Sequence, residues 1–292
     1  MGLLDFLRGF FKTAPALGVI ELARRLGLTT VELLAVEPSY RRFTIPKRSG
    51  ERRIAAPSPE LRDLQRRILR RLLARLRVHP AVHGFERKRS IVTNALPHAG
   101  KEVVVRMDLR NFFESTPAER VERFFRKVGW DRKASRLLMI LCTLDGSLPQ
   151  GAPTSPRLSN LVNFRLDARL AGLARKLNAT YTRYADDLTF SFEANDPPSI
   201  HGLLWWVKRI VNAEGYQLHQ KKKLDIRRRH NRQLVTGLVV NESVDLPRAT
   251  RRWLRAVDHH LAGGRPATLT PAQRAGWKSL ASMVDRQAGR SA

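Results

Sequence analysis

The sequence predicts an α+β fold, in which short strands and amphipathic helices are interspersed along a chain of 292 residues. Runs of β-forming residues flank Asp186 and Asp187, a pattern typical of a hairpin with the acids at its turn. A second run, residues 101–107, is predicted to form a buried strand. Leucine and isoleucine recur at helical spacing in longer segments. A chain of this length can bury a sizeable core and divide into two or three lobes.

The first part of the chain is predicted to contain short helices, a hairpin and a long helix. Residues 1–39 read as two or three short helices. A turn rich in proline, serine and glycine then separates strands at 41–45 and 52–55. A Ser-Pro pair opens a long helix at 58–77, because both residues favour the first turn. The arginines of that helix form either a solvated basic face or a surface for nucleic acid: Arg66, Arg67, Arg70, Arg71 and Arg75.

The later elements follow from periodicity and from turn residues. Helical spacing predicts helices at 118–127, 132–143, 157–175 and 200–213. Strands are predicted at 224–228 and 234–240. After Pro247 a basic helix runs to a Gly-Gly break, and a Thr-Pro pair caps a final helix at 270–285.

The chain is strongly basic. Lysine and arginine number 54 against 26 aspartate and glutamate residues, which gives a formal net charge of +28. Such an imbalance favours binding to a polyanion, with an affinity that falls as salt rises. A basic membrane-surface protein is the alternative. The chain has no apolar run of about 18 residues, no signal-peptide pattern and no myristoylation pattern, so we expect no membrane partner.

Two apolar features are most simply explained as core. Cys142 is the only cysteine and follows an apolar helical run, so a disulfide within the chain is impossible and a cytoplasmic location is expected. Trp205 and Trp206 fall inside a helical run and are predicted to pack in the core rather than to stack on bases.

Three aspartates are the candidates for chemistry. Asp108 ends the predicted buried strand, and the turn of the hairpin can bring Asp186 and Asp187 to one place. A solvated Asp-Asp turn would explain the dipeptide alone. Carboxylates from separate elements that converge can hold two hard divalent cations, as two-metal phosphoryl transfer requires. We therefore predict that these three aspartates are catalytic metal ligands.

Three blocks of sequence in series resemble the palm motifs of reverse transcriptases. They read DLRNFF at 108–113, LPQGAPTSP at 148–156 and YADDLTFS at 184–191. The middle block is a Gly/Pro-rich loop that leads into a helix, where backbone amides could face a nucleotide. Residues 45–54 are similar to the fingers hairpin of the family, and residues 215–222 to its fourth palm motif, with His219 where asparagine is usual.

The resemblance covers about residues 40–262 and implies a right-hand polymerase fold with fingers, an antiparallel palm and a helical thumb. It also implies two Mg²⁺ ions as cofactors. The expected boundaries are an N-terminal helical extension at 1–39, fingers at 40–100, palm at 101–241 and thumb at 242–292.

The family resemblance also implies roles in nucleotide binding. Gln150 resembles the loop glutamine that contacts the incoming nucleotide. Phe113 matches the sugar-gate position, where a large ring excludes a 2′-hydroxyl; ordinary core packing is the alternative. Lys222 resembles the lysine of the fourth motif, although Lys221 and Lys223 leave that alignment open and a solvated lysine cluster would explain all three.

Basic residues of the predicted fingers hairpin are candidates for binding the triphosphate. Lys47 and Arg52 are our first choice, because a guanidinium suits bidentate phosphate contact. Arg48 and Arg53 are the alternatives, since a one-residue slip exchanges the faces of a strand.

Two further segments are similar to the signature regions of bacterial retron reverse transcriptases. An N-A-x-x-H pattern occupies residues 94–98 and a Val-Thr-Gly triplet occupies residues 235–237. The Ala-Pro-Thr-Ser-Pro form of the loop at 152–156 agrees with that subfamily. The resemblance implies recognition of a cognate RNA by five residues: Asn94, His98, Val235, Thr236 and Gly237.

The chain is thus identified as an RNA-directed DNA polymerase that resembles the retron type. Its implied partners are a cognate noncoding RNA that serves as template and primer, the DNA product, dNTPs and a retron effector protein. Priming from a 2′-hydroxyl, a branched RNA–DNA product and a role in antiphage defence are further implications. Two alternatives stay open: another bacterial reverse transcriptase primed from a 3′ end, and a non-catalytic RNA-binding scaffold or maturase.

Overall fold

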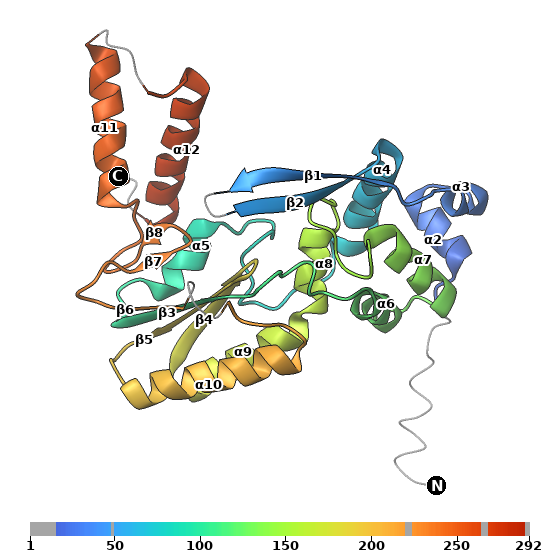
Figure 1. Cartoon of the computed structure of the whole chain (residues 1–292), viewed down its shortest axis with the longest axis horizontal. Helices are drawn as coiled ribbons and strands as arrows, with labels where there is room; N and C mark the ends of the chain where they lie inside the picture. Colours follow the sequence, from blue (N-terminus) through green and yellow to red (C-terminus); the bar gives the residue numbers. More distant parts are fainter. Residues whose placement is uncertain (1–15, 48–49, 220–223, 264–267, 290–292) are drawn as a thin grey trace. The chain divides into compact units, whose positions relative to one another are not determined.

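The computed structural model of the protein describes residues 16–47, 50–219, 224–263 and 268–289, shown in Figure 1. Helices and strands are both present, which confirms the predicted α+β class. The chain divides into two compact units, each assembled from two stretches of sequence. The first unit is Met1–Arg77 with Phe113–Val162, and the second is Val78–Phe112 with Asn163–Ala292.

The first unit combines a hairpin with a group of helices. Strands β1 (Tyr40–Lys47) and β2 (Gly50–Pro57) pair antiparallel, which confirms the hairpin predicted from the turn residues. The helices of this unit are α2 (Val19–Leu26), α3 (Thr30–Leu34), α4 (Pro59–Ile68), α6 (Ala118–Lys127), α7 (Arg132–Cys142) and α8 (Ser155–Val162).

The long helix predicted at 58–77 begins as expected but changes form near its middle. The Ser58 hydroxyl accepts a hydrogen bond from the Leu61 N–H, so the predicted cap is confirmed. After α4 the chain continues as a π-helical turn, η1 (Leu69–Leu73), and regular helix does not reach residue 77. Arg157 donates to the carbonyls of Leu73 and Ala74, each at 3.4 Å, and so satisfies the acceptors that an ended helix leaves unpaired.

The second unit is built around a four-stranded antiparallel sheet with the order β4-β5-β3-β6. The strands are β3 (Val103–Asp108), β4 (Ala179–Tyr184), β5 (Asp187–Phe192) and β6 (Asp225–Arg228). A small hairpin is formed by β7 (Leu234–Val235) and β8 (Leu238–Val239). The helices are α5 (Ile91–Ala95), α9 (Phe164–Lys176), α10 (Pro197–Ala213), α11 (Arg248–Ala262) and α12 (Pro271–Gln287).

Strand alternation gives this sheet two different faces. Helices α9 and α10 lie on one side and α5 on the other (Figure 1). The side facing α9 buries the apolar residues Val103, Val105, Met107, Leu188 and Phe190. The opposite side is largely polar and carries Arg106, Asp108, Thr182, Asp187, Thr189 and Ser191. The acids therefore share a face with α5.

Two predicted elements are interrupted in the structure. The helix predicted at 157–175 is two helices, α8 and α9, because Asn163 leaves helical geometry and its Nδ2 donates to Tyr216 Oη at 2.8 Å. The strand predicted at 234–240 is the β7–β8 hairpin. Thr236 and Gly237 at its turn have φ values of 47° and 82°, which no continuous strand allows.

The prediction that Trp205 and Trp206 pack in the core is wrong. Their exposed fractions are 48% and 47%. The buried positions of α10 follow helical spacing and do not include either tryptophan. They are Ile200, Leu203, Val207, Ile210 and Val211. Cys142, by contrast, is buried as predicted, and its burial raises the pKa of the thiol to about 12.

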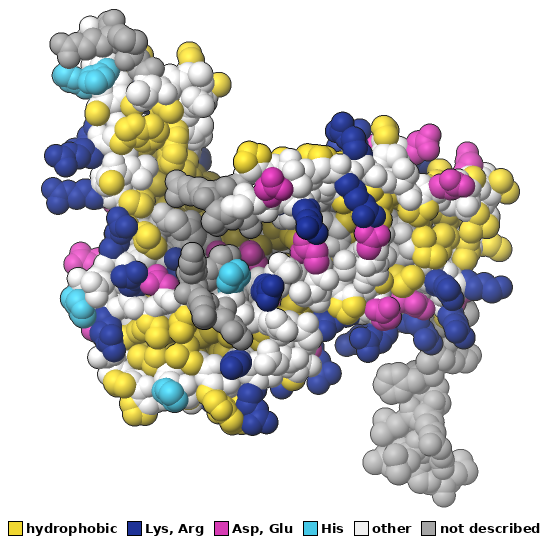
Figure 2. Space-filling view, viewed as in Figure 1, with side chains coloured by type: hydrophobic (Ala, Val, Ile, Leu, Met, Phe, Trp, Pro, Cys, Tyr) yellow, Lys and Arg dark blue, Asp and Glu magenta, His cyan; other side chains and the backbone are white. Residues whose placement is uncertain are grey.

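Basic side chains are exposed on several elements. Figure 2 shows Lys and Arg side chains along α11 and around α4 and α6. The five arginines singled out in the helix predicted at 58–77 are all exposed, four of them on α4 and η1 and Arg75 just after η1. Among the described residues, no helix combines the length and the apolar character that crossing a bilayer requires.

Candidate active site

The sheet of the second unit brings the predicted carboxylates together at one end. Asp108 closes β3, Asp187 opens β5, and their Cα atoms are direct partners in the strand register. Directly opposite residues on antiparallel strands project to the same face. Asp186 occupies the turn before β5, and its carbonyl accepts a hydrogen bond from the Leu109 N–H at 3.0 Å. Backbone pairing thus fixes the two acid-bearing elements to each other.

The turn that carries Asp186 is strained. Ala185 and Asp186 are the only residues between paired Tyr184 and Asp187, and Ala185 has a φ of 57°. Non-glycine residues in this left-handed region cost on the order of 1–3 kcal/mol and persist only where their surroundings hold them. A two-residue turn with this geometry is an efficient way to present a carboxylate at a strand end.

Gly84 packs directly against this turn. A Cβ atom at position 84 would lie 2.5 Å from the Ala185 nitrogen, so only glycine fits. The segment before it follows β4: the His83 N–H donates to the Arg183 carbonyl, and the Arg183 N–H donates to the Ala81 carbonyl, both at 2.8 Å. The backbone of residues 81–84 therefore supports the turn from one side.

Donor chemistry and register make the carboxylates suitable for a hard divalent cation. Two like charges directly opposite on neighbouring strands repel, and a cation between them removes that cost. Asp108 is 5% exposed, whereas the Asp187 side chain is 34% exposed and lies 4.0 Å from an Arg106 nitrogen. No group of three or more His, Cys, Asp or Glu side chains in the described ranges is already arranged to hold a metal ion. The three carboxylates are nevertheless the kind of oxygen ligand that would hold Mg²⁺.

A buried ion pair stands behind the same turn. Arg183 Nε and Nη2 each donate to Asp167 at 2.7 Å, and both side chains are 0% exposed. Arg183 Nη1 donates to the Ala185 carbonyl at 2.9 Å. Burial opposes the charge of Arg183, but the carboxylate of Asp167 holds its pKa above the ordinary value. Tyr181 Oη donates to Asp167 at 3.0 Å and completes the cluster.

This cluster and Gly84 were not predicted from the sequence. The available signal was local. Arg183 occupies a strand position on the apolar face of the sheet, directly before the acidic motif. Asp167 lies at helical spacing with buried Leu170 and Ala174, so it points inward from α9. One acidic residue on the buried face of a helix and one basic residue on the apolar face of a strand together predict an ion pair between Asp167 and Arg183.

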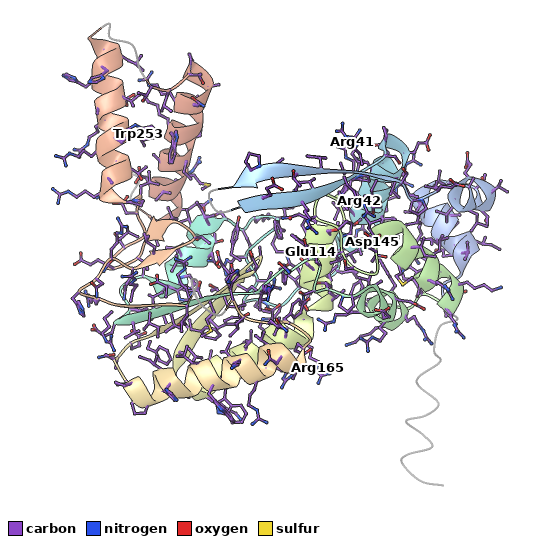
Figure 3. All side chains as sticks on the ribbon, viewed as in Figure 1. Arg41, Arg42, Glu114, Asp145, Arg165 and Trp253 are labelled. Carbon is purple, nitrogen blue, oxygen red and sulfur yellow. The ribbon has the colours of Figure 1, made fainter. Side chains whose placement is uncertain are left out.

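In the first unit, Gln150 lines a cavity of about 470 Å³ between the β1–β2 hairpin and the loop before α8. The hairpin contributes Arg53, whereas Arg52, our first choice, is not among the lining residues. Arg42 and Asp145 form an ion pair at 2.8 Å on the same cavity wall, which also includes Glu114 (Figure 3).

The loop that carries Gln150 is anchored to β2. The Ala55 N–H donates to the Gln150 carbonyl at 2.9 Å. Gly151 has a φ of 130°, and a Cβ there would lie 2.7 Å from the Ala55 carbonyl oxygen. Glycine is therefore required at position 151 by the close approach of two backbones. This anchoring fixes the position of Gln150 within the first unit.

Of the other residues predicted to bind the nucleotide, the structure describes the side chain of Phe113 but not those of Lys47 and Lys222. Phe113 is half-buried, whereas the neighbouring Phe112 is 5% exposed and packs on Tyr216 with 5.7 Å between ring centroids. Lys47 pairs with Gly50 at the end of the hairpin, but its side chain and the whole of Lys222 lie outside the described residues.

The N-A-x-x-H residues lie inside the second unit. His98 is 0% exposed, with Nδ1 2.7 Å from Ser191 Oγ and Nε2 2.8 Å from Thr182 Oγ1. Burial, with smaller contributions from the charges of His83 and Lys101, lowers the pKa of His98 to about 3. Asn94 is also 0% exposed, and neither of its amide atoms has a hydrogen-bond partner among the residues that the structure describes. Direct contact of these two side chains with RNA conflicts with their burial.

The Val-Thr-Gly triplet packs against the same segment. Val235 is 0% exposed and belongs to one apolar cluster with Val92 and Ala95. Thr236 Oγ1 donates to the Ile91 carbonyl at 2.9 Å, whereas Gly237 is exposed. The two segments singled out from the sequence thus form one structural module, here called the α5 module (residues 90–98 with 234–239). The backbone of Gly237 is accessible to RNA, whereas Val235 is fully buried and cannot contact RNA directly.

Comparisons with known proteins agree with the geometry. The family described as reverse transcriptase (RNA-dependent DNA polymerase) matches residues 45–229. The chain is 39% identical to the retron Mx162 reverse transcriptase of Myxococcus xanthus, over 92% of this chain and 64% of the relative. It is 42% identical to the retron Mx65 reverse transcriptase of the same organism, over 76% of this chain and 56% of the relative.

A third relative is covered more completely. The retron Ec86 reverse transcriptase of Escherichia coli is 36% identical over 92% of this chain and 84% of its own length. The chain spans less than two thirds of the length of the two Myxococcus relatives. The family match includes Asp108, Gln150 and the turn at 184–187. The chain therefore belongs to the reverse transcriptase family and, within it, to the retron type.

Proposed function

We propose that this protein is an RNA-directed DNA polymerase. The observation that carries the proposal is the register that sets Asp108 opposite Asp187, with Asp186 on the connecting turn, inside the region that matches the family. Bound Mg²⁺ would supply the charge neutralisation needed when a primer hydroxyl attacks the α-phosphate of a dNTP. The three aspartates would hold the ions, and the Leu109–Asp186 backbone bond would keep their two elements together.

Residues of the first unit would bind the nucleotide. Gln150 would contact the incoming dNTP from its anchored loop. Arg53 is favoured over Arg52 for the triphosphate, because Arg53 and Gln150 line the same cavity. Phe113 would act as the sugar gate, a role that its half-buried ring allows. Lys47 and Lys222 remain candidates for phosphate contact on the sequence resemblance alone.

In the language of polymerases, the β1–β2 hairpin would belong to the fingers and the sheet β4-β5-β3-β6 to the palm. The helices α11 and α12 would form the thumb. The predicted boundaries 40–100, 101–241 and 242–292 remain our assignment of these parts. The antiparallel sheet that ends in acidic residues supports the palm, and the exposed arginines of α11 support a nucleic-acid-facing thumb.

We further propose that the substrate is a cognate structured noncoding RNA, primed from a 2′-hydroxyl and copied into a branched RNA–DNA molecule. The names of the relatives and the presence of both signature segments support this choice. An associated effector protein and a role in antiphage defence belong to the same proposal. Because Asn94 and His98 are buried, they would act on RNA recognition through the shape of the α5 module.

The test uses the native locus. Expressed with its flanking DNA, the protein should accumulate short single-stranded DNA joined to RNA. RNase treatment should leave a few ribonucleotides at the 5′ end of the DNA, and debranching enzyme should remove them. Unbranched DNA would retain the polymerase but favour priming from a 3′ end. Absence of any DNA, with RNA binding intact, would favour the scaffold alternative.

A further inference from the structure

The buried pair of Arg183 and Asp167 lies directly behind the turn that presents Asp186. Its geometry is complete: two hydrogen bonds join the guanidinium to the carboxylate at 2.7 Å, and the remaining terminal nitrogen reaches the Ala185 carbonyl at 2.9 Å. Both side chains are fully buried, so neither can contact a template, a primer or a nucleotide. They can therefore affect the reaction only indirectly, by holding the conformation of the turn that carries Asp186.

Fold stability alone is a weak reason for such a pair. Removing two charges from water is costly, and well-packed apolar residues of similar volume often serve a core as well or better. Buried apolar side chains occupy the same helix and the neighbouring strand, with Leu170 on α9 and Phe190 on β5. What an apolar residue cannot do is donate a hydrogen bond to the Ala185 carbonyl.

The turn needs that donor because Ala185 is held in a left-handed conformation, with a φ of 57°. Gly84 closes the turn from one side, because a Cβ at position 84 would lie 2.5 Å from the Ala185 nitrogen. Arg183 closes it from the other by binding the Ala185 carbonyl. Gly84 thus confines the nitrogen of Ala185 and Arg183 binds its carbonyl oxygen. Both peptide groups of Ala185 are held, and they set the direction of Asp186.

We propose that Arg183, oriented by Asp167, is a positioning residue that fixes the Ala185–Asp186 turn and so aims the carboxylates at the catalytic metal ions. The inference rests on the proposed polymerase function and adds residues to it that touch neither substrate nor metal. Asp167 acts one step further away, because its two oxygens determine where the guanidinium lies. Tyr181 and the ring of Phe112, 5.5 Å from the guanidinium, limit the space in which Arg183 can move.

Two variants separate positioning from packing. Arg183→Lys keeps a cation beside Asp167 but cannot donate to both carboxylate oxygens and the Ala185 carbonyl together. The double variant Arg183→Met with Asp167→Leu removes both buried charges and so avoids leaving one unpaired. Arg157→Lys is the matched control, since Arg157 is also buried and donates to backbone carbonyls in the first unit.

Each variant is measured for thermal unfolding, for Mn²⁺ binding by electron paramagnetic resonance, and for the Mg²⁺ concentration that gives half-maximal primer extension. Loss of a group that orients a metal ligand typically costs about 10–100-fold in metal affinity or activity. We expect a loss of this size in Arg183→Lys and in the double variant, with the double variant unfolding near the wild-type temperature. Arg157→Lys should keep wild-type metal dependence even where it unfolds earlier.

The outcome that overturns the proposal is a folded double variant, or a folded Arg183→Lys, with wild-type Mn²⁺ affinity and Mg²⁺ dependence. Arg183 would then be a core residue only. Failure of the polymerase function itself looks different: the wild-type protein would bind Mn²⁺ but extend no primer. The Mn²⁺ measurement would still decide the role of Arg183 in that case.

Discussion

Asp108 and Asp187 illustrate what a single residue contributes at this site. Asp108 is nearly buried and Asp187 is not, although the register sets them opposite each other. The alternation of strand residues made this shared face predictable once the hairpin was recognised. The support behind it was not predictable from the motif, because Arg183 and Asp167 are 16 residues apart and meet only when α9 packs on the sheet.

Replacing Asp108 or Asp186 by asparagine should abolish DNA synthesis and leave RNA binding nearly unchanged. Each change removes a metal ligand, and the loss of stabilised charge in the transition state should lower kcat by at least about 100-fold. The 54 basic residues still supply phosphate contacts. Primer extension and RNA binding are measured side by side, with the exposed Asp63→Asn as control. Near-normal synthesis by either variant would refute the metal-site assignment.

Phe113→Val should weaken discrimination against ribonucleotides. A smaller side chain opens space beside C2′, so kcat/KM for an NTP should rise relative to that of the matched dNTP. A change of about 10-fold in the ratio corresponds to about 1.4 kcal/mol. Measuring both substrates on one template gives the ratio directly. An active variant with an unchanged ratio would place the gate at another residue.

At the scale of elements, local patterns predicted most helices and strands but not their interruptions. The helix α6 occupies 118–127 as predicted, since its apolar spacing is regular. The break between α8 and α9 depends on the bond from Asn163 to Tyr216, 53 residues away. The α5 module likewise joins segments that are distant in sequence, and its burial converts residues predicted to contact RNA into internal ones.

Gly84→Ala should damage the active turn without a general loss of fold. A methyl group 2.5 Å from the Ala185 nitrogen must displace backbone. We expect a fall in kcat of about 10-fold or more, as when a supporting group of a metal site is lost. Gly172→Ala on α9 is the control, because nothing lies within 4 Å of the added Cβ and stability should rise by up to about 1 kcal/mol. Equal activities in the two variants would contradict the support role of Gly84.

His98 should make stability depend on pH. Its pKa is about 3 in the folded protein and near 6.5 when unfolded, so protons bind the unfolded chain preferentially between these values. The stabilisation is complete above pH 6.5 and is lost progressively as pH falls toward 3. Between pH 6.5 and 5 the contribution amounts to about 2 kcal/mol. Free energies of unfolding for wild type and His98→Gln should therefore converge over this interval, whereas exposed His201→Gln should follow wild type.

At the scale of the whole molecule, charge is the property that the sequence predicts most directly. An excess of 28 positive charges follows from composition, without any fold. Which of these charges meet nucleic acid depends on exposure and on pairing with acids. Arg24 and Arg25 are tied to Glu21 within α2, whereas Arg252 and Arg255 lie exposed on α11, the proposed thumb.

These two pairs of arginines allow the thumb assignment to be tested through salt dependence. For single-stranded nucleic acid, each phosphate contact contributes about −0.7 to the slope of log affinity against log salt. Replacing Arg252 and Arg255 by glutamine should therefore reduce the slope by about 1.4 in magnitude. Replacing Arg24 and Arg25 instead should leave it near the wild-type value, because their charges already face a carboxylate. RNA affinity measured from low to high salt gives all three slopes. Equal slopes for wild type and the α11 variant would show that Arg252 and Arg255 do not contact the nucleic acid. The assignment of the carboxylate site would not be affected by that result.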